Sequence, residues 1–256
     1  MNLVNRTAVS LFQRLRRMRV QRLEVSGKRL LDVGAGDGRF VLEMASRGWD
    51  AYGCEPAVVG QAQAKKSGIG DRIIYGTVET LPDTAPPYDV ITMWHALEHV
   101  ENPVDLLQTL QKHLTPRGRI LISVPNHAGW VVQWFGAKSF HLDVPRHRFH
   151  FSPKSLSALL TRCGYQVNRI SHFSLEYSPF GWWQTLLNAC GLEHNGLYRW
   201  LKRGGKLTRR TGAARAGAAV ATLLLSVIFV PLSFVLSTVE AFVRRGMIIT
   251  VSAEKS

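Results

Sequence analysis

The segment WHALEHV, residues 94–100, holds the side chains best suited to catalysis. His95, Glu98 and His99 form H-x-x-E-H, the spacing with which two histidines bind zinc beside a general-base glutamate in one group of metalloproteases. That chemistry needs a helix long enough to hold both histidines. Here the segment directly follows an apolar strand, and Asn102-Pro103 opens a new helix soon after it, so only about one helical turn is available. We therefore expect these residues to face a ligand at the end of a strand rather than a zinc ion.

A glycine-rich loop earlier in the chain predicts where that ligand binds. DVGAGDG, residues 32–38, follows a short apolar strand, and its glycines allow a tight turn and close backbone approach. Glu55 ends the next strand, at a position suited to ribose hydroxyls. The dinucleotide motif G-x-G-x-x-G has two residues between its second and third glycines, whereas this loop has one. Asp32 would repel a pyrophosphate but attract an ammonium group.

Strands and helices alternate around these motifs. This pattern predicts a doubly wound, mainly parallel sheet. We expect strands at 28–33, 50–55, 72–76, 88–94, 118–125, 165–171 and 247–253, and helices at 39–48, 57–67, 103–114 and 155–163.

Four motifs in order resemble one enzyme family. LLDVGAGDGRF, CEP, YDVITMWHALEHVENP and LTPRGRILISVPN are similar to segments of the class I S-adenosylmethionine-dependent methyltransferases, closest to the group with the ubiquinone-pathway O-methyltransferases. The resemblance covers about residues 28–174 and 247–255. It implies an α/β, Rossmann-like seven-stranded sheet whose last strand is antiparallel, and S-adenosylmethionine as cofactor.

The resemblance also assigns roles to residues. Glu55 would bind both ribose hydroxyls, and Trp94 would lie beside the cofactor's sulfonium, where an aromatic face favours a cation. Relatives usually have an aspartate near the adenine amine, but Thr77 stands there, so Thr77, the Val78 backbone and Glu79 are the adenine candidates. The methionine end of the cofactor would be held by Asp32, Gly34, Ala35, Gly36 and Gly38.

The transfer itself asks for alignment of the acceptor and, for a hydroxyl acceptor, a general base. The catalytic candidates are His95, His99, Glu98 and His147. His147 belongs to the loop HLDVPRHRFH, residues 141–150, which resembles the substrate-side lid of relatives and also holds His141, Asp143, Pro145 and Arg146. Packing alone is the alternative for each histidine. We assign no metal ligand, and assistance by a divalent metal stays open.

The net charge of +14 lies in two short segments. Residues 1–30 carry eight Lys/Arg and one acid, and residues 196–215 carry seven Lys/Arg and no acid. The first segment fits a basic amphipathic helix. Such segments suit an anionic membrane or nucleic acid. The three dispersed cysteines, without a C-x-x-C pair, favour a reduced, cytoplasmic-side protein, and no signal peptide is evident.

A hydrophobic insertion separates the sixth strand from the last. Residues 216–239 are 24 uncharged residues, about 36 Å as a helix, against a bilayer core of about 30 Å. Because the last strand must rejoin the sheet, we expect a monotopic or re-entrant helical hairpin bent near Pro231. The aromatic segment 178–201 would lie at the membrane interface. A buried core helix is the alternative.

These observations predict three parts and one function. The parts are a basic helix over 1–27, a methyltransferase domain over 28–174 and 246–256, and a membrane-associating insertion over 175–245. We expect O-methylation of a lipid-tailed acceptor, either a polyprenyl quinone precursor or a lipid-linked glycan, on the cytoplasmic side of an anionic membrane. Nucleic acid is a less favoured partner. An RNA methyltransferase and a non-catalytic scaffold remain as alternatives.

Overall fold

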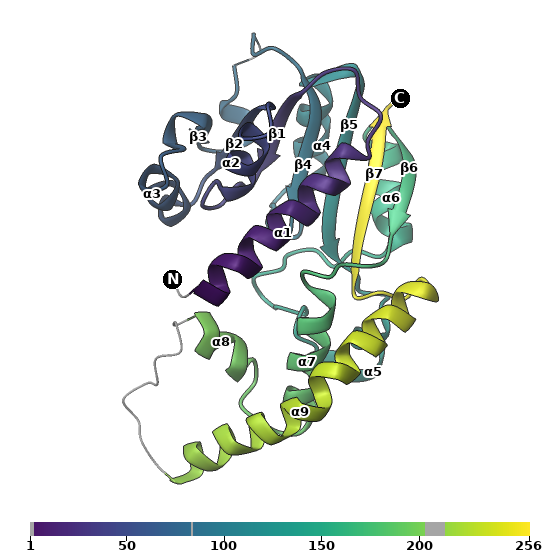
Figure 1. Cartoon of the computed structure of the whole chain (residues 1–256). Helices are drawn as coiled ribbons and strands as arrows, with labels where there is room; N and C mark the ends of the chain where they lie inside the picture. The colour runs from purple at the N-terminus through teal and green to yellow at the C-terminus, as the bar shows by residue number, and fades with distance from the viewer. Residues whose placement is uncertain (1–2, 83, 203–212) are drawn as a thin grey trace. The chain divides into compact units, whose positions relative to one another are not determined.

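A seven-stranded sheet in the order β3-β2-β1-β4-β5-β7-β6 forms the centre of the computed structural model (Figure 1). Strands β1 to β5 run parallel, and β7 runs antiparallel to them, as the sequence predicts. The structure describes residues 3–82, 84–202 and 213–256, without the side chains of 3–9 and 213–216. The arginines and lysine of the second basic run from 203 to 215 therefore lie outside what is described.

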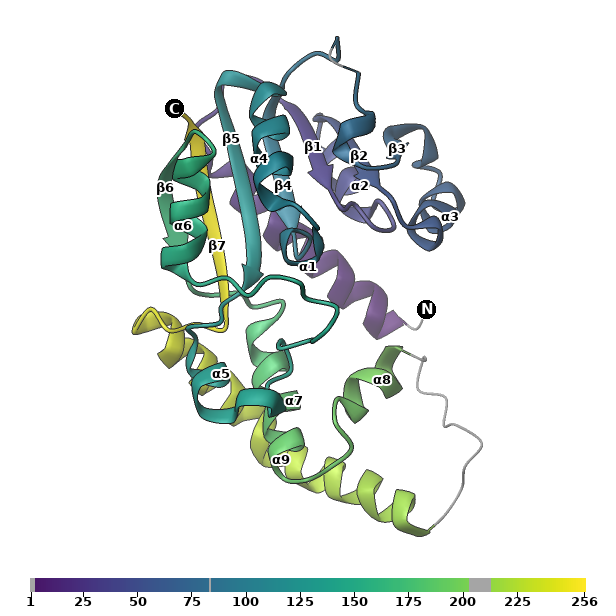
Figure 2. The same ribbon diagram turned by 180° about the vertical axis from the view of Figure 1, so that it is seen from behind.

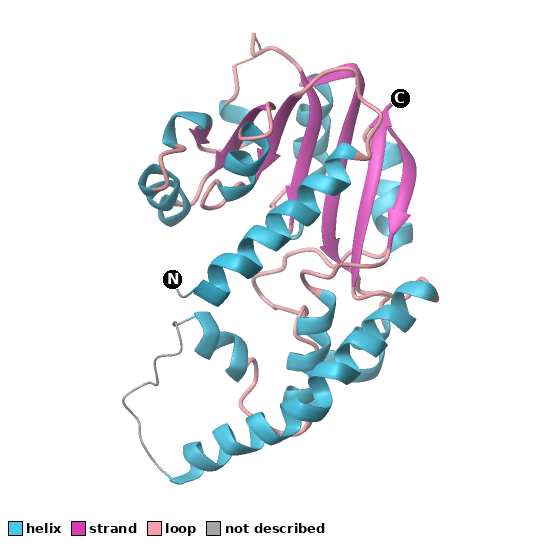
Figure 3. Ribbon diagram, in the orientation of Figure 1, coloured by secondary structure: helices cyan, strands magenta, loops and turns pink. Residues whose placement is uncertain are grey.

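The elements follow the predicted alternation. The strands are β1 (Arg29–Val33), β2 (Asp50–Glu55), β3 (Ile73–Tyr75), β4 (Tyr88–Trp94), β5 (Leu114–Pro125), β6 (Tyr165–Ser171) and β7 (Ile248–Lys255). The helices are α1 (Leu3–Gln21), α2 (Arg39–Ala45), α3 (Val58–Lys66), α4 (Pro103–Lys112), α5 (Trp130–Phe135), α6 (Pro153–Arg162), α7 (Ser178–Ala189), α8 (Gly196–Lys202) and α9 (Ala213–Phe242). Figure 3 separates these helices from the strands by colour.

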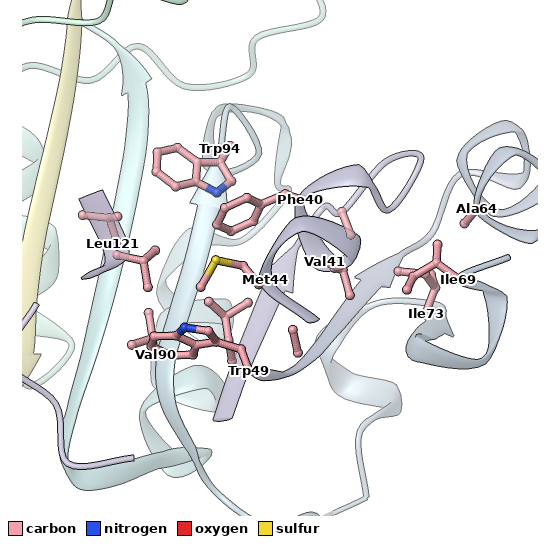
Figure 4. Packing of buried hydrophobic residues seen from close by; sticks show 14 residues of the cluster. Phe40, Val41, Met44, Trp49, Ala64, Ile69, Ile73, Val90, Trp94 and Leu121 are labelled. Atoms are coloured by element: carbon pink, nitrogen blue, oxygen red, sulfur yellow. The ribbon is translucent and has the colours of Figure 1, made fainter. Parts of the chain in front are cut away.

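The sheet is covered on both faces, which explains its continuous apolar strands. All seven residues of β4 are buried, as expected of a central parallel strand. Helices α1 and α2 lie on one face, and α4 and α6 lie on the other (Figures 1 and 2). Between the sheet and α2, Phe40, Met44 and Trp49 pack against Val90 and other buried residues (Figure 4).

Helix α1 forms where the basic amphipathic helix was expected, and it packs on α2 beside the sheet. Val20 is fully buried in the core beside α2. Arg17 forms an ion pair with Glu43 of α2, with 2.8 Å between Nε and Oε1. Because the same turn supplies both an apolar and a cationic contact, part of the basic face belongs to the interior of the domain.

The chain forms two compact units. The first comprises residues 1–124, 154–170 and 250–256, and the second comprises residues 125–153 and 171–249. Residues 125–153, which we expected in the methyltransferase domain, thus group with the insertion. The reason lies in the segment after β5: Asn126 N–H donates to Met247 O (2.8 Å), and Trp130 N–H donates to Arg245 O (3.1 Å).

The hydrophobic insertion is one helix of 30 residues rather than the hairpin that we expected. Pro231 lies inside α9. A proline removes one hydrogen bond from the helical ladder, but it supplies no reversal of the chain. Residues 218–242 contain no Gly, Asn or Asp that would favour a tight turn, so the helix continues. The alternative of a buried core helix is also wrong, because only 6% of the apolar window of α9 is buried.

Candidate functional site

The buried carboxyl of Asp32 lies near the end of β1, beside the point where the strand order of the sheet reverses. Asp32 is 2% exposed, and the Thr92 hydroxyl of neighbouring β4 donates to its Oδ1 at 2.6 Å. Burial raises the pKa of Asp32 to about 7, while the Thr92 hydrogen bond and the nearby Arg16 charge act to lower it. Strand order places the switch between β1 and β4, where ligands of open α/β sheets bind. Asp32 can therefore gain or lose a proton near neutral pH at the switch point of the sheet.

The glycine loop after β1 has two glycines that packing requires and one that faces open space. Gly34, Gly36 and Gly38 all have positive φ angles, of 74°, 57° and 74°. A Cβ on Gly34 would lie 2.9 Å from the Ala96 Cβ, and one on Gly38 would lie 2.7 Å from an Ile69 methyl group. A Cβ on Gly36 would meet no described atom within 4 Å. The backbone at Gly36 is thus open to a ligand.

Glu55, at the end of β2, is held against this loop. Its Oε2 accepts the Gly36 N–H and its Oε1 accepts the Ala57 N–H, both at 2.7 Å. Glu55 is 7% exposed. A Cβ on Gly60 would approach the Glu55 Cγ to 2.8 Å, so this glycine leaves room for the acid. The two backbone contacts fix the carboxylate in orientation, as recognition of a pair of hydroxyls requires.

The segment after β3, residues 77–80, has Thr77 in place of the acid that relatives usually have near the adenine amine. Val78 is 1% exposed, whereas Thr77 and Glu79 are exposed at the start of a short 3₁₀ helix, Val78–Thr80. The Thr77 carbonyl accepts the Thr80 hydroxyl at 2.7 Å. Val78 therefore anchors the segment while Thr77 and Glu79 face solvent.

Trp94 ends β4 with its ring in the first unit's core. The ring packs edge-on against Phe40, with 5.6 Å between centroids, and it is 8% exposed (Figure 4). Its indole Nε1 is buried without a hydrogen-bond partner among the described residues. Above the ring lies the Arg16 guanidinium of α1, 5.2 Å from the centroid.

His95 and Glu98 form a polar pair directly after Trp94. The His95 Nδ1 lies 3.1 Å from Glu98 Oε1, and the Glu98 side chain is buried. His95 has φ 54°, an unusual conformation that concentrates at functional sites. Only a three-residue 3₁₀ helix, Leu97–His99, follows. The long helix that a zinc protease motif needs does not form in WHALEHV, because the strand runs up to Trp94.

The chain is similar to known methyltransferases in sequence and fold. A family model described as a methyltransferase domain matches residues 7–170. The chain belongs to the methyltransferase-domain family. The ubiquinone biosynthesis O-methyltransferase of Pectobacterium carotovorum is 35% identical over 127 residues, 47% of this chain and 53% of that protein. The enzyme of the same name from Vibrio cholerae is 31% identical over 165 residues, 60% of this chain and 66% of that protein.

The solved structures agree on the fold. A SAM-dependent methyltransferase from Archaeoglobus fulgidus has a TM-score of 0.57 at 17% identity, covering 97% of this chain and 94% of that one. The match to the curated relatives spans only about half to two thirds of their length. The comparisons confirm the expected methyltransferase fold and S-adenosylmethionine as the cofactor.

The site of this methyltransferase fits the cofactor on its own geometry. Asp32 would provide a carboxyl for the ammonium, Gly36 an open backbone and Glu55 an oriented carboxylate for two hydroxyls. When bound, the cofactor supplies the electrophilic methyl group. Trp94 stays the predicted neighbour of the sulfonium, because an aromatic face favours a cation, although the Arg16 guanidinium lies over the same ring.

Arg16 lies beside two of the predicted cofactor residues, Asp32 and Trp94, and was not among the sequence predictions. Its charge acts to lower the pKa of Asp32, and its guanidinium lies over the Trp94 ring. A guanidinium there suits the carboxylate of the cofactor's methionine end. The arginines of α1 are too closely spaced for the sequence to show which of them turns toward the domain. The inward face of the helix is identified by the burial of Val20, one turn after Arg16.

The other histidine candidates are less tied to the cofactor residues. His99 is exposed at the end of its 3₁₀ helix. His147 belongs to the second unit, where its Nδ1 lies 3.0 Å from the His141 carbonyl oxygen within the loop 141–150. In the same loop, Arg146 pairs with Asp143 at 3.1 Å. The loop is therefore braced internally, and His147 stays a candidate.

Proposed function

We propose that this chain is an S-adenosylmethionine-dependent O-methyltransferase that modifies a lipid-tailed acceptor at an anionic membrane surface. The observation that carries the activity is the combination of Asp32, open Gly36 and Glu55 at the switch point of a methyltransferase sheet. A chain that had kept only the fold would have no need of a buried ionisable carboxyl beside an open glycine. The names of the similar curated proteins support transfer to oxygen.

The apolar helix α9 supports the lipid-tailed acceptor. Its apolar stretch, Gly217–Phe242, has a mean hydropathy of 2.5, and most of it is exposed. An enzyme with a wholly water-soluble acceptor would gain nothing from so large an apolar surface, which otherwise promotes aggregation. A polyprenyl quinone precursor and a polyprenyl-linked glycan share the chemistry of a long apolar tail with a hydroxylated head.

The His95–Glu98 pair is the proposed general base. When Nδ1–H of an imidazole donates to a carboxylate, Nε2 becomes the basic nitrogen, and it can take the proton of an attacking hydroxyl. The bound cofactor would supply the methyl group that this oxygen accepts, and its sulfur would leave as a neutral thioether. His99 and His147 are the alternatives for the same role.

Labelled cofactor incubated with a membrane lipid extract tests this proposal. We expect label in an organic-soluble product whose mass exceeds its precursor by one methylene, and none with the Asp32→Asn variant. Label only in RNA would support the alternative enzyme instead. If calorimetry detects no binding of S-adenosylmethionine, the result would support the non-catalytic scaffold.

A further inference from the structure

Helix α9 buries a stripe of polar side chains and leaves many apolar side chains exposed. Ser233, Ser237 and Glu240 are 1%, 0% and 0% exposed. On the opposite side, Val227 is 75% and Phe242 is 90% exposed. A helix on the surface of a water-soluble domain has the reverse arrangement. An apolar solvent on the outer side of α9 explains why the hydroxyl-bearing stripe faces the protein.

Both halves of α9 are attached to the second unit. Near its middle, the Trp183 indole N–H of α7 donates to the Ser226 hydroxyl at 2.9 Å. At its end, the Met247 backbone N–H donates to Glu240 Oε1 at 3.0 Å. Helix α7 has 12 residues, about 18 Å, too short for a bilayer core of about 30 Å. A helix that crossed the bilayer would draw this short partner into the hydrocarbon with it.

The charges next to α9 are alike at its two ends. Arg209, Arg210 and Arg215 precede or begin the helix in the sequence, and Arg244 and Arg245 follow it. Spanning helices show an excess of Lys/Arg on one side. Basic residues at both ends fit a helix whose two ends meet the same layer of anionic head groups.

Exposed tryptophans accompany this surface in the second unit. Trp134 is 57% exposed and stacks on Trp130, with 4.9 Å between centroids. Trp200 on α8 is 44% exposed. Tryptophan is enriched where hydrocarbon meets head groups, so these residues suit a protein that enters the interface from one side.

We propose that α9 lies in the plane of a single leaflet of an anionic bilayer, with the face of Val220, Leu224, Val227, Val235 and Val239 in the acyl region. The polar stripe stays on α7, and the helix does not cross the membrane. This inference deepens the proposed membrane association and rests on it, but it does not depend on which acceptor is methylated.

Depth measurements on vesicles test the inference. In a Cys190→Ser background, Val220→Cys, Val227→Cys and Val239→Cys each receive a fluorescent label. The vesicles contain phosphatidylglycerol and phosphatidylcholine brominated at a shallow or a deep acyl position. An in-plane helix predicts the same, shallow quenching profile at all three sites. Deepest quenching at Val227, with shallow ends, would mean a spanning helix and would overturn the inference.

Charge substitutions test the face itself. Val227→Asp with Val235→Asp should lower the vesicle-bound fraction more than about tenfold, because aspartate is strongly disfavoured in hydrocarbon. Val59→Asp on α3 is the matched control, since Val59 is 71% exposed in the first unit, and it should float normally. Equal flotation of both variants would contradict the assigned face.

The outcomes separate the two proposals. If the wild-type chain does not float, membrane association fails as a whole. If the chain floats and methylates a lipid, but the label at position 227 is quenched most strongly by the deep bromines, only the in-plane arrangement fails. Light scattering of the lipid-free protein is the remaining check: a stable dimer that shields the three labels would mean that a second copy covers α9, and it would overturn the inference.

Discussion

At the scale of single residues, Asp32 combines two properties that oppose one another. Its burial disfavours the ionised form, yet the ammonium of the cofactor needs a carboxylate partner. The Thr92 hydrogen bond and the Arg16 charge reduce this conflict only in part, because the pKa stays raised, at about 7. Ordinary solution pH therefore divides the protein between a form that can pair with the cofactor and one that cannot.

The affinity for S-adenosylmethionine should consequently depend on pH. Below about pH 7 a proton must leave Asp32 when the cofactor binds. The Kd should therefore rise about tenfold for each unit by which the pH is lowered. Above that pH it should level off. Calorimetry between pH 5.5 and 8.5 measures this. The Asp32→Asn variant should bind weakly with a flat profile, and a wild-type slope retained in that variant would assign the titration to another group.

Stability should change in the opposite direction. The folded-state pKa of Asp32 lies above the unfolded value of 3.8, so between about pH 4 and 7 the folded state binds more protons. The free energy of unfolding therefore falls as the pH rises through that window. Asp32→Asn removes the buried charge and should raise the melting temperature at pH 8 by a few degrees. Unchanged or lower melting would contradict a buried carboxylate at that pH.

His95 allows a separation of chemistry from binding. Because its φ is 54°, asparagine is the substitution that keeps the backbone, since asparagine tolerates the left-handed region. His95→Asn and Glu98→Gln should each lower kcat by about 10²- to 10⁴-fold and leave the cofactor Kd near wild type. Turnover of labelled cofactor and calorimetry give the two quantities. If His99→Ala lowers kcat and His95→Asn does not, the base is His99.

At the scale of elements, the catalytic sheet follows directly from sequence patterns, whereas the placement of α1 does not. Strands β1 and β4 were predictable because a doubly covered parallel strand must be apolar throughout. The helix before them has arginines at 14, 16, 17, 19 and 22, which point in nearly every direction around its axis. Periodicity therefore could not tell that Arg16 and Arg17 turn inward. Helix α9 is one continuous helix and not the expected hairpin, because Pro231 alone does not reverse a chain that lacks turn residues.

The contribution of α1 can be tested with two neighbouring arginines. Arg16→Ala removes a charge that lowers the pKa of Asp32, so the pH midpoint of cofactor binding should rise and the affinity at pH 7 should fall. Arg17→Ala is the matched control. It breaks the ion pair with Glu43, which links α1 to α2, and a hydrogen bond to Gln21 within α1, and it should leave the midpoint unchanged. A shift of equal size in both variants would point to a displaced helix rather than to the charge at the site.

At the scale of the whole molecule, net charge and exposed apolar surface lead to different salt dependences. The two basic runs account for the net charge of +14, and they attract any polyanion. This attraction is screened at about 1 M salt, where the Debye length is about 3 Å. Burial of the outer face of α9 in acyl chains does not depend on ionic attraction. We therefore expect that binding to phosphatidylglycerol vesicles weakens from 0.1 M to 1 M NaCl. Flotation measures this binding. At 1 M NaCl the wild-type chain should still bind more than the variant with both Val227→Asp and Val235→Asp. RNA should be released completely over the same range, because its binding is electrostatic. Vesicle release as complete as that of RNA would mean that charge alone holds the protein on the membrane, and α9 would then need another explanation.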